Sequence, residues 1–557
     1  MISRFIIILI CLLPIIAGLA GAILPASGWF APLGRYDFSL EPVFMFLDQP
    51  GIWTSIWLSG FTALIATFIS YVLAMVLLVR LYHNGRAGLI FRLIAPLLAV
   101  PHITVAAGFL FLLQPSGWLI RLLSPWLTGW ERPPDLYLIP DGYGVGLILA
   151  LIAKELPFLL LMGVSALSQI RVSDHMDHAA SLGYRPYSAW LYTITPQLAK
   201  RMRLPVMIVL MFSVSVVDMA LILAPSLPAP LAPRILDWFY DADLNHQFNA
   251  AVGAVVQLGL ALLCCVIWIS SAYVTGQFIR YLTYHGRRGY LPSVLVKGSK
   301  HSLFIIAILP CLISVMGLLS VIIWGFANIW RFPAVFPDQW GVRAWINTVD
   351  VMFVAGFNSV MIAGISALAS IIIAIIWFEQ TATRDHSHME KWVYLPLLLP
   401  QASFLFGLQV LLIWFRLDGH YITLIWVHML FVFPYVMLTL GPIWRRFDCR
   451  YTDIAATLGA GKIKRLFRIK LPILLTPIMT AFAIGFSVSC ALYLPTIFAS
   501  NGRMVTLTTE AVTLASGASR QALGVASILQ MILPLVVFLL CDAVIRWRFG
   551  RFRHFRS

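Results

Sequence analysis

The chain has 557 residues, of which 60% are hydrophobic and only 11% are charged. This composition excludes a soluble globular domain and is typical of a protein that crosses a membrane many times. The 39 Lys and Arg residues outnumber the 23 Asp and Glu residues, but no soluble basic face accompanies this excess, so membrane topology explains it and we expect no nucleic-acid partner. The seven cysteines lack metal-binding spacing, so we interpret them as reduced packing residues and expect neither a metal ion nor a cofactor.

Twelve apolar stretches approach or exceed the roughly 20 residues that a membrane-spanning helix requires. The first could instead be a cleaved signal peptide, because Arg4 precedes its apolar run and small residues follow it, but its length favours a retained anchor. The sequence therefore predicts an all-α polytopic membrane protein with spans at 4–24, 53–79, 91–113, 144–168, 204–224, 250–274, 302–327, 351–378, 392–415, 421–443, 473–495 and 521–545.

The orientation follows from the Lys and Arg residues near the span ends, because positive residues are held on the cytoplasmic side. If the N-terminus is inside, the inward segments carry 29 of the 39 basic residues and the outward loops carry nine. We therefore expect a bacterial inner-membrane protein with both termini in the cytoplasm.

Two polar segments between spans share one spacing. DHAASLGYRPYSAWLYTITP begins at Asp177, and DIAATLGAGKIKRLFRIKLP begins at Asp453. Each segment has its glycine six residues after the aspartate, at Gly183 and Gly459, and its proline thirteen residues further on, at Pro196 and Pro472. We call residues 174–200 the first loop and residues 447–472 the second loop, and we expect both to be cytoplasmic.

Other landmarks repeat at a similar offset. Pro101 and Gly108 match Pro400 and Gly407, FSVS occurs at 212–215 and 486–489, and two further pairs are Ser55 with Ser359 and Gly60 with Gly364. Internal repeats of this kind indicate duplicated units. The sequence predicts two homologous six-span repeats in parallel orientation, at 1–276 and 301–557, joined by a cytoplasmic linker at 277–300.

Each loop begins with a carboxylate and small residues that favour a helical turn, and its glycine can adopt the left-handed conformation that ends a helix. A second short helix then leads to the proline that opens the next span. In the second loop, apolar residues alternate with Lys462, Lys464, Arg465, Arg468 and Lys470, which predicts an apolar docking face and a basic face for lipid phosphates.

These loops resemble the hallmark of the permease subunits of binding-protein-dependent ABC importers, E-A-A-x-x-x-G followed after nine residues by I-x-L-P. The second loop matches as D-I-A-A-T-L-G and I-K-L-P, whereas the first departs from the pattern at His178 and ends in T-I-T-P. Two copies in one chain are similar to fused permeases of the iron(III) and thiamine type. The resemblance implies contact with a separate ATPase through Asp177, Ala179, Gly183 and Pro196 and through Asp453, Ala455, Gly459, Ile469, Leu471 and Pro472.

The resemblance also implies two copies of that ATPase subunit and an extracytoplasmic solute-binding protein. The segment Gly459-Ala460-Gly461-Lys462 lacks the first glycine and the hydroxyl residue of a phosphate-binding loop, so we expect no ATP hydrolysis by this chain. The solute stays open among small molecules such as thiamine, iron(III) or a polyamine. The rival is an ion-coupled secondary carrier with twelve spans, which needs no matched docking loops.

Ionisable residues within spans are functional candidates because their burial in a membrane is costly. Asp218 is the candidate pathway residue, and ungapped alignment places Leu492 at its position in the second repeat. It could line the path of a cationic solute or pair with a neighbour near the outer interface. Lys154 and Glu155 are expected to support the structure more than to contact solute, and the spans' histidines, His102 and His428, are expected to hydrogen-bond between helices.

Overall fold

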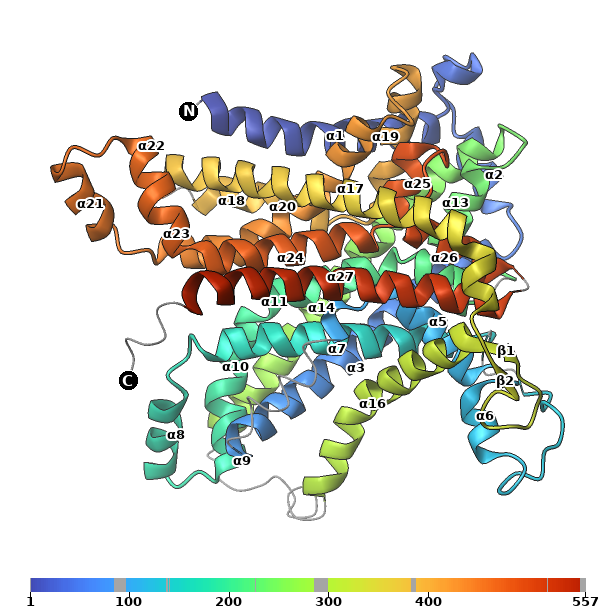
Figure 1. Ribbon diagram of the computed structural model, residues 1–557, viewed down its shortest axis with the longest axis horizontal. Helices are drawn as coiled ribbons and strands as arrows, with labels where there is room; N and C mark the ends of the chain where they lie inside the picture. Colours follow the sequence, from blue (N-terminus) through green and yellow to red (C-terminus); the bar gives the residue numbers. More distant parts are fainter. Residues whose placement is uncertain are drawn as a thin grey trace.

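The computed structural model is a bundle of long helices, with one two-stranded sheet among its described residues (Figure 1). It describes residues 2–84, 97–136, 139, 141–225, 227–284, 299–381, 387–517 and 519–550. The centre of the expected linker, 285–298, lies outside these residues. The predicted all-α membrane fold is confirmed.

We use N-terminal half for residues up to 284 and C-terminal half for residues from 299. The N-terminal half contains α1 (Ile2–Ala26), η1 (Ala31–Leu33), α2 (Glu41–Leu47), α3 (Ile52–Asn84), α5 (His102–Leu113), α6 (Trp118–Leu123), α7 (Val145–Leu167), α8 (Val172–Ser181), α9 (Pro186–Ala189), η2 (Trp190–Ile194), α10 (Thr195–Arg201), α11 (Arg203–Val214), α12 (Asp218–Leu223), α13 (Leu231–Phe239) and α14 (His246–Tyr284). The C-terminal half contains α16 (Ser299–Phe326), β1 (Ala327–Ile329), β2 (Gln339–Trp340), α17 (Arg343–Thr381), α18 (Ser387–Val393), η3 (Leu395–Leu397), α19 (Gln401–Trp414), α20 (Tyr421–Arg445), α21 (Arg450–Thr457), α22 (Lys462–Arg465), η4 (Leu466–Lys470), α23 (Leu471–Ile473), α24 (Leu475–Ala491), α25 (Leu494–Ser500), α26 (Leu507–Ser516) and α27 (Arg520–Gly550). The segments η2 and η4 are π-helical turns.

Every predicted span contains an apolar helix, but their lengths differ. Among the described residues, nine helices are long and apolar enough to cross a membrane, and a tenth span results if the bent pair Lys462–Ile473 and Leu475–Ala491 is taken together. The predicted spans at 204–224 and 392–415 contain the shorter helices α11 and α19, of 12 and 14 residues. Helices of that length reach only about 18–21 Å, less than the roughly 30 Å of a hydrocarbon core, so neither crosses it alone.

The first helix of each half packs on the other half. Helix α1 lies against α19, where a Cβ atom on Gly407 would overlap the backbone of Gly18 and Gly21. Helix α16 lies against α5, where the backbones of Gly317 and Gly108 meet in the same way. Glycine is required at these crossings because the helix backbones approach too closely for a side chain. The two halves are therefore interlocked.

The fifth predicted span of each half is interrupted, and a buried glutamine satisfies the backbone at the interruption. In the N-terminal half, Gln257 of α14 donates a hydrogen bond of 2.6 Å to the carbonyl oxygen of Val214, the last residue of α11. In the C-terminal half, Gln530 of α27 donates to the hydroxyl of Thr508 at 2.9 Å, and that hydroxyl donates to the carbonyl oxygen of Cys490. These bonds matter because an unsatisfied buried carbonyl costs about 1–3 kcal/mol.

A serine in the second span of each half accepts a hydrogen bond from the first N–H of a later helix. Ser59 Oγ accepts from the N–H of Leu231 at 2.8 Å, and Ser359 Oγ accepts from the N–H of Leu507 at 2.9 Å. The expected match of Ser55 with Ser359 is therefore wrong in register, because Ser59 makes the contact equivalent to that of Ser359.

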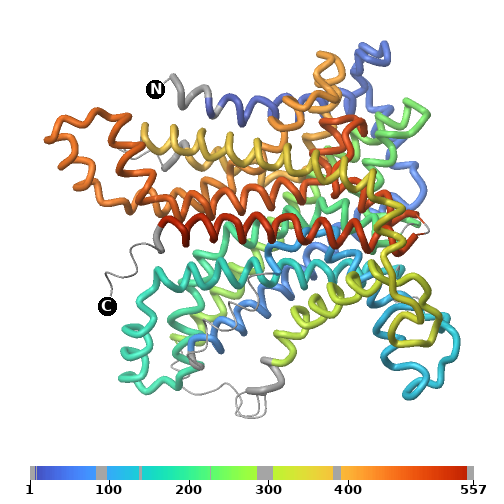
Figure 2. The backbone as a smooth tube through the Cα atoms, in the orientation of Figure 1, coloured from blue at the N-terminus to red at the C-terminus, as the bar shows by residue number. Residues whose placement is uncertain are grey.

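The bundle has two distinct ends (Figures 1 and 2). The first and second loops lie at one end, where α1 begins and α27 finishes, and we call it the loop end. Helix α6 and the strands β1 and β2 lie at the opposite end, here the sheet end. There Arg121 joins the two halves, because its guanidinium donates to the carbonyl oxygens of Arg331 and Ala334 at 2.7 and 3.0 Å and stacks 4.6 Å from the ring centre of Trp330.

Candidate coupling loops and translocation pathway

The first loop is a helix, a tight turn and a second helical segment, as its sequence predicts. Gly183 has a φ of +81°, which favours glycine because it carries no Cβ atom. Its N–H donates to the carbonyl oxygen of Ala180 at 2.9 Å, and the next N–H donates to that of Ala179 at 3.0 Å. This bond pair is a Schellman motif that ends α8. Ala179 is buried beneath the turn, whereas Asp177 is exposed.

The second loop repeats this geometry. Gly459 has a φ of +77°, its N–H donates to the carbonyl oxygen of Ala456 at 3.0 Å, and the next N–H donates to that of Ala455 at 2.9 Å. Ala455 is buried and Asp453 is exposed, as are the equivalent residues of the first loop. The two motifs therefore expose equivalent helix ends and equivalent carboxylates at the loop end.

The prolines of the two loops lie in short helices that precede the spans, whereas the sequence predicts that they open the spans. Pro196 is the second residue of α10, and Pro472 is the second residue of α23. Neither opens the following span, which starts only after a break at Met202 or Leu474. In the second loop the segment preceding the break makes an angle of 76° with α24. The short helical segment therefore runs nearly perpendicular to the span.

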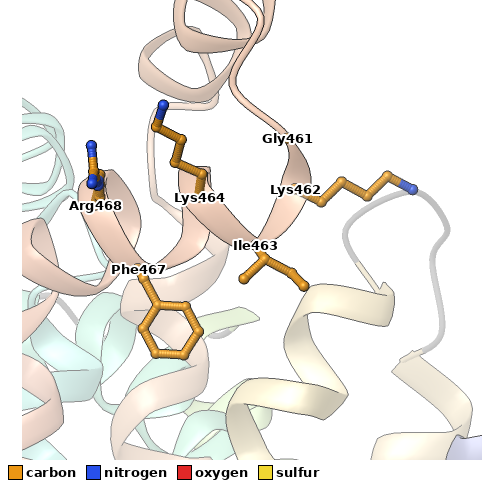
Figure 3. A pocket seen from close by; sticks show the side chains of 6 residues that line it. All are labelled: Gly461, Lys462, Ile463, Lys464, Phe467 and Arg468. Carbon is orange, nitrogen blue, oxygen red and sulfur yellow. The ribbon is translucent and has the colours of Figure 1, made fainter.

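Exposed basic and apolar side chains meet on the second helical segment of the second loop (Figure 3). A shallow open hollow of about 580 Å³ is lined by Gly461, Lys462, Ile463, Lys464, Phe467 and Arg468. Ile463 and Phe467 point to one side of the segment and Lys464 and Arg468 to the other. Because Ile463 and Phe467 are 75% and 64% exposed, this segment offers an apolar surface with a basic surface behind it. Ile469 and Leu471, by contrast, are half-buried.

One residue of the expected basic face lies elsewhere. Lys470 is buried, and its Nζ forms an ion pair of 2.5 Å with Glu379 of α17. The expectation that it faces lipid phosphates is wrong, because Lys470, at the end of η4, packs against Glu379 of α17 and Trp444 of α20. The role of Glu379 was missed because its partner is 91 residues away in sequence.

Asp218, the candidate pathway residue, occupies the interruption of the fifth span. It is the first residue of α12, it is buried, and its Oδ1 accepts a hydrogen bond of 2.9 Å from the N–H of Met219. Its carboxyl group lies within electrostatic range of His102 and Lys154. The first residue of the corresponding helix α25 is Leu494, so the ungapped match with Leu492 is displaced by the break.

The other buried charged groups near Asp218 have partners of their own. Lys154 Nζ donates to the carbonyl oxygens of Leu98 and Val100 at 3.1 and 2.5 Å, just before α5 begins. Glu155 Oε1 lies 3.8 Å from Nε2 of His102. Lys154 and Glu155 thus have partners on neighbouring segments and do not need to pair with each other.

His428 connects three helices of the C-terminal half. Its Nδ1 and Nε2 lie 2.7 and 3.0 Å from the hydroxyl oxygens of Ser489 and Thr496. The adjoining cavity is about 10 Å³, which is barely enough for one water molecule. This environment suits a hydrogen bond between helices. Across the residues that the structure describes, no three His, Cys, Asp or Glu side chains are grouped so that they could hold a metal ion.

Comparison with known proteins identifies two relatives of this chain. The chain is 30% identical over 531 residues to the inner membrane ABC transporter permease protein YnjC of Escherichia coli (strain K12), covering 91% of this chain and 94% of that protein. It is 22% identical over 165 residues to the spermidine/putrescine transport system permease protein PotC of Haemophilus influenzae, covering 30% of this chain and 61% of PotC. No protein-family model matches the chain.

Proposed function

The chain belongs to the permease proteins of inner membrane ABC transporters, and we propose that its two loops couple its halves to two copies of a separate ATPase subunit. It is the permease subunit of an importer, which the relatives favour over an ion-coupled carrier. The observation that carries the coupling proposal is the paired Schellman motif. Both motifs lie at one end of the bundle, and the matched aspartates Asp177 and Asp453 are exposed.

The proposed contact uses both loops. In the first it comprises Asp177, Ala179, Gly183 and Pro196, and in the second it comprises Asp453, Ala455, Gly459, Ile469, Leu471 and Pro472. Closure of the two ATPase subunits on ATP would draw the loops together and move one half against the other. The two halves are then homologous repeats, at 1–276 and 301–557, and the matched serine contacts and interrupted spans support this assignment. The loop end is cytoplasmic in this proposal.

Replacing the loop glycines tests the coupling. Gly459→Pro is incompatible with a φ of +77°, because proline requires a φ near −65°, and it should abolish co-purification with the ATPase subunit. Gly183→Pro should weaken it. The matched control is Gly129→Pro, since Gly129 also has a positive φ, of +71°, and open space around it, but it lies after α6 towards the sheet end. If all three variants retain the ATPase equally, the docking assignment is wrong.

For the solute, we propose a small cation that passes Asp218. The buried carboxylate at a break between two helices supports this, because a fixed negative charge in a low-dielectric path favours a positive solute. PotC is named for spermidine and putrescine, so these polyamines are the first solutes to test, followed by thiamine and iron(III). Asp218→Asn should impair uptake and leave ATPase binding intact. The control Asp243→Asn, at an exposed aspartate, should leave uptake unchanged. Normal uptake by Asp218→Asn would remove this residue from the pathway.

The remaining partners are a solute-binding protein and membrane lipid. The sheet end supports the first assignment, because the Arg121 contacts hold its segments together while Trp126 and Phe336 remain 72% and 58% exposed. Lys464 and Arg468 support contact with lipid phosphates beside the second loop. Trp126→Ser combined with Phe336→Ser should lower the stimulation of ATP hydrolysis by the binding protein, and unchanged stimulation would refute this docking surface.

A further inference from the structure

The second loop is joined to two spans by a set of contacts around Lys470. Besides its ion pair with Glu379 of α17, the ammonium group lies 4.7 Å from the ring centre of Trp444 in α20 and 5.4 Å from that of Phe447. Trp444 in turn stacks on Phe378 of α17, with ring centres 5.8 Å apart. We call these five residues the lysine clamp. It joins the last residue of η4 to the ends of α17 and α20.

The partly buried environment of the lysine clamp strengthens its ion pair and its cation–π interaction. The side chains of Lys470 and Glu379 are 9% and 35% exposed, so the ion pair is partly shielded from water and salt. The aromatic face of Trp444 adds a cation–π interaction, which is stronger where the cation is desolvated. A short side chain could not make these contacts, because Lys470 reaches from the loop to both spans at once.

The first loop has an apolar residue at the position that corresponds to Lys470. The residue 276 positions before Lys470 is Ile194, which is fully buried in an apolar cluster with Trp190. Arg80 of α3 reaches this loop by donating to the hydroxyl of Tyr187 at 2.8 Å. Both loops are therefore attached to the last turns of a long span, but only the second has a lysine at this position.

We propose that Lys470 is the positioning residue through which movement of the second loop is passed to α17 and α20. This inference rests on the proposed contact of the loops with an ATPase. ATP-driven displacement of the loop pulls on Glu379 and Trp444 through one ammonium group, and the two spans follow. Without the clamp, the ATPase still binds and hydrolyses ATP, but the sheet end no longer responds.

The test measures that response in the purified complex of this chain with its ATPase, reconstituted in lipid nanodiscs. Spin labels are placed at the sheet end by Ile346→Cys and Tyr143→Cys, whose side chains are 66% and 70% exposed, in a Cys449→Ser background. Cys449 must be removed because it is the exposed one of the seven cysteines. Distances between the labels are measured with and without MgATP.

We expect Lys470→Met and Glu379→Gln to lose at least half of the ATP-induced distance change and to keep ATP hydrolysis within twofold of the parent complex. The double exchange Lys470→Glu with Glu379→Lys restores the opposite charges and should recover more than half of the change. Lys200→Met is the matched control, because it removes an exposed lysine from α10 and leaves the lysine clamp intact.

The outcomes separate the two proposals. If the parent complex shows no ATP-dependent change, the proposed coupling itself is wrong. If the parent responds and Lys470→Met responds equally, the role of Lys470 is overturned. If Lys470→Met does not assemble, Glu379→Gln and the double exchange decide the question, and a normal response in Glu379→Gln would refute the clamp.

Discussion

The crossing of α1 and α19 gives the sharpest test of how the two halves are held together. In Gly407→Ala the new methyl group would lie 2.5 Å from the backbone nitrogen of Ala22 and would overlap the carbonyl oxygen of Gly18, where ordinary contact begins at 3.4 Å. Neither neighbour is a flexible side chain that can turn away, so α1 must retreat by about 1 Å. A gap of that size forfeits a quarter to a half of the dispersion energy of the separated contacts.

The expected cost is therefore that of overpacking, about 1–3 kcal/mol. Replacing glycine by alanine inside a helix also gains about 0.5–1 kcal/mol of helix propensity, and a control must carry the same gain. Gly364→Ala does so, because Gly364 lies within α17 and an added Cβ atom there meets no other atom within 4 Å. The difference between the two variants isolates the steric cost.

The assay is thermal unfolding of the purified protein in detergent, followed by the fluorescence of its 19 tryptophans. Gly407→Ala should melt several degrees below Gly364→Ala, and Gly108→Ala, whose Cβ atom would lie 2.8 Å from the carbonyl carbon of Gly317, should fall between them. Equal melting temperatures for Gly407→Ala and Gly364→Ala would show that α1 does not pack at this crossing. The same result would follow if α1 were removed as a signal peptide, and mass spectrometry of the purified chain separates these two explanations.

Three further predictions concern Cys449, Gln257 and Ser359. Cys449 is exposed in the second loop, so a membrane-impermeant maleimide should label it in inside-out vesicles and not in right-side-out vesicles; the reverse pattern would place the loop end outside. Gln257→Leu removes the donor to the carbonyl oxygen of Val214 and should cost about 1–3 kcal/mol, seen as a lower melting temperature, and an unchanged one would show that another group satisfies the carbonyl. Ser359→Ala leaves the buried N–H of Leu507 without its 2.9 Å acceptor and should cost about 1–3 kcal/mol, while a loss of co-purifying ATPase from this variant would contradict a purely local role.

The features that the sequence predicts correctly are those that depend on local chemistry. Apolar runs locate the helices because a membrane span needs its own continuous hydrophobic length, and Gly183 and Gly459 locate the ends of α8 and α21 because a left-handed residue strongly favours glycine. The interruption before Asp218 is invisible to hydropathy, since the residues on both sides of it are apolar. The buried carbonyl of Val214 that the interruption leaves free accepts a hydrogen bond from Gln257, which is distant in sequence.

Lys470 shows the same limit at the candidate site. At about 100° per residue it lies about 120–160° around a helix from Lys464 and Arg468, so it does not share their face, but this period does not identify the residues that it packs against. The nearest sequence signal is its position, directly before Leu471 and Pro472 at the approach to a span, where an unpaired cation is costly. That signal indicates that a partner is needed, but only the packing of α17 against the second loop identifies Glu379 as the partner.

The interlocked first helices limit the kinds of movement that the proposed coupling can use. Because α1 is packed on α19 and α16 on α5 through backbone contacts, each half carries the first helix of the other when it moves, and sliding along these crossings would break close contacts. Rotation that keeps both crossings intact is less costly, and it requires flexible points within the remaining spans. The interruptions at 214–218 and 491–494 provide such points, since their backbone is held by side-chain hydrogen bonds in place of helical ones. Asp218 lies at one of them, so a change in helix direction there would move the carboxylate that is proposed to contact the solute.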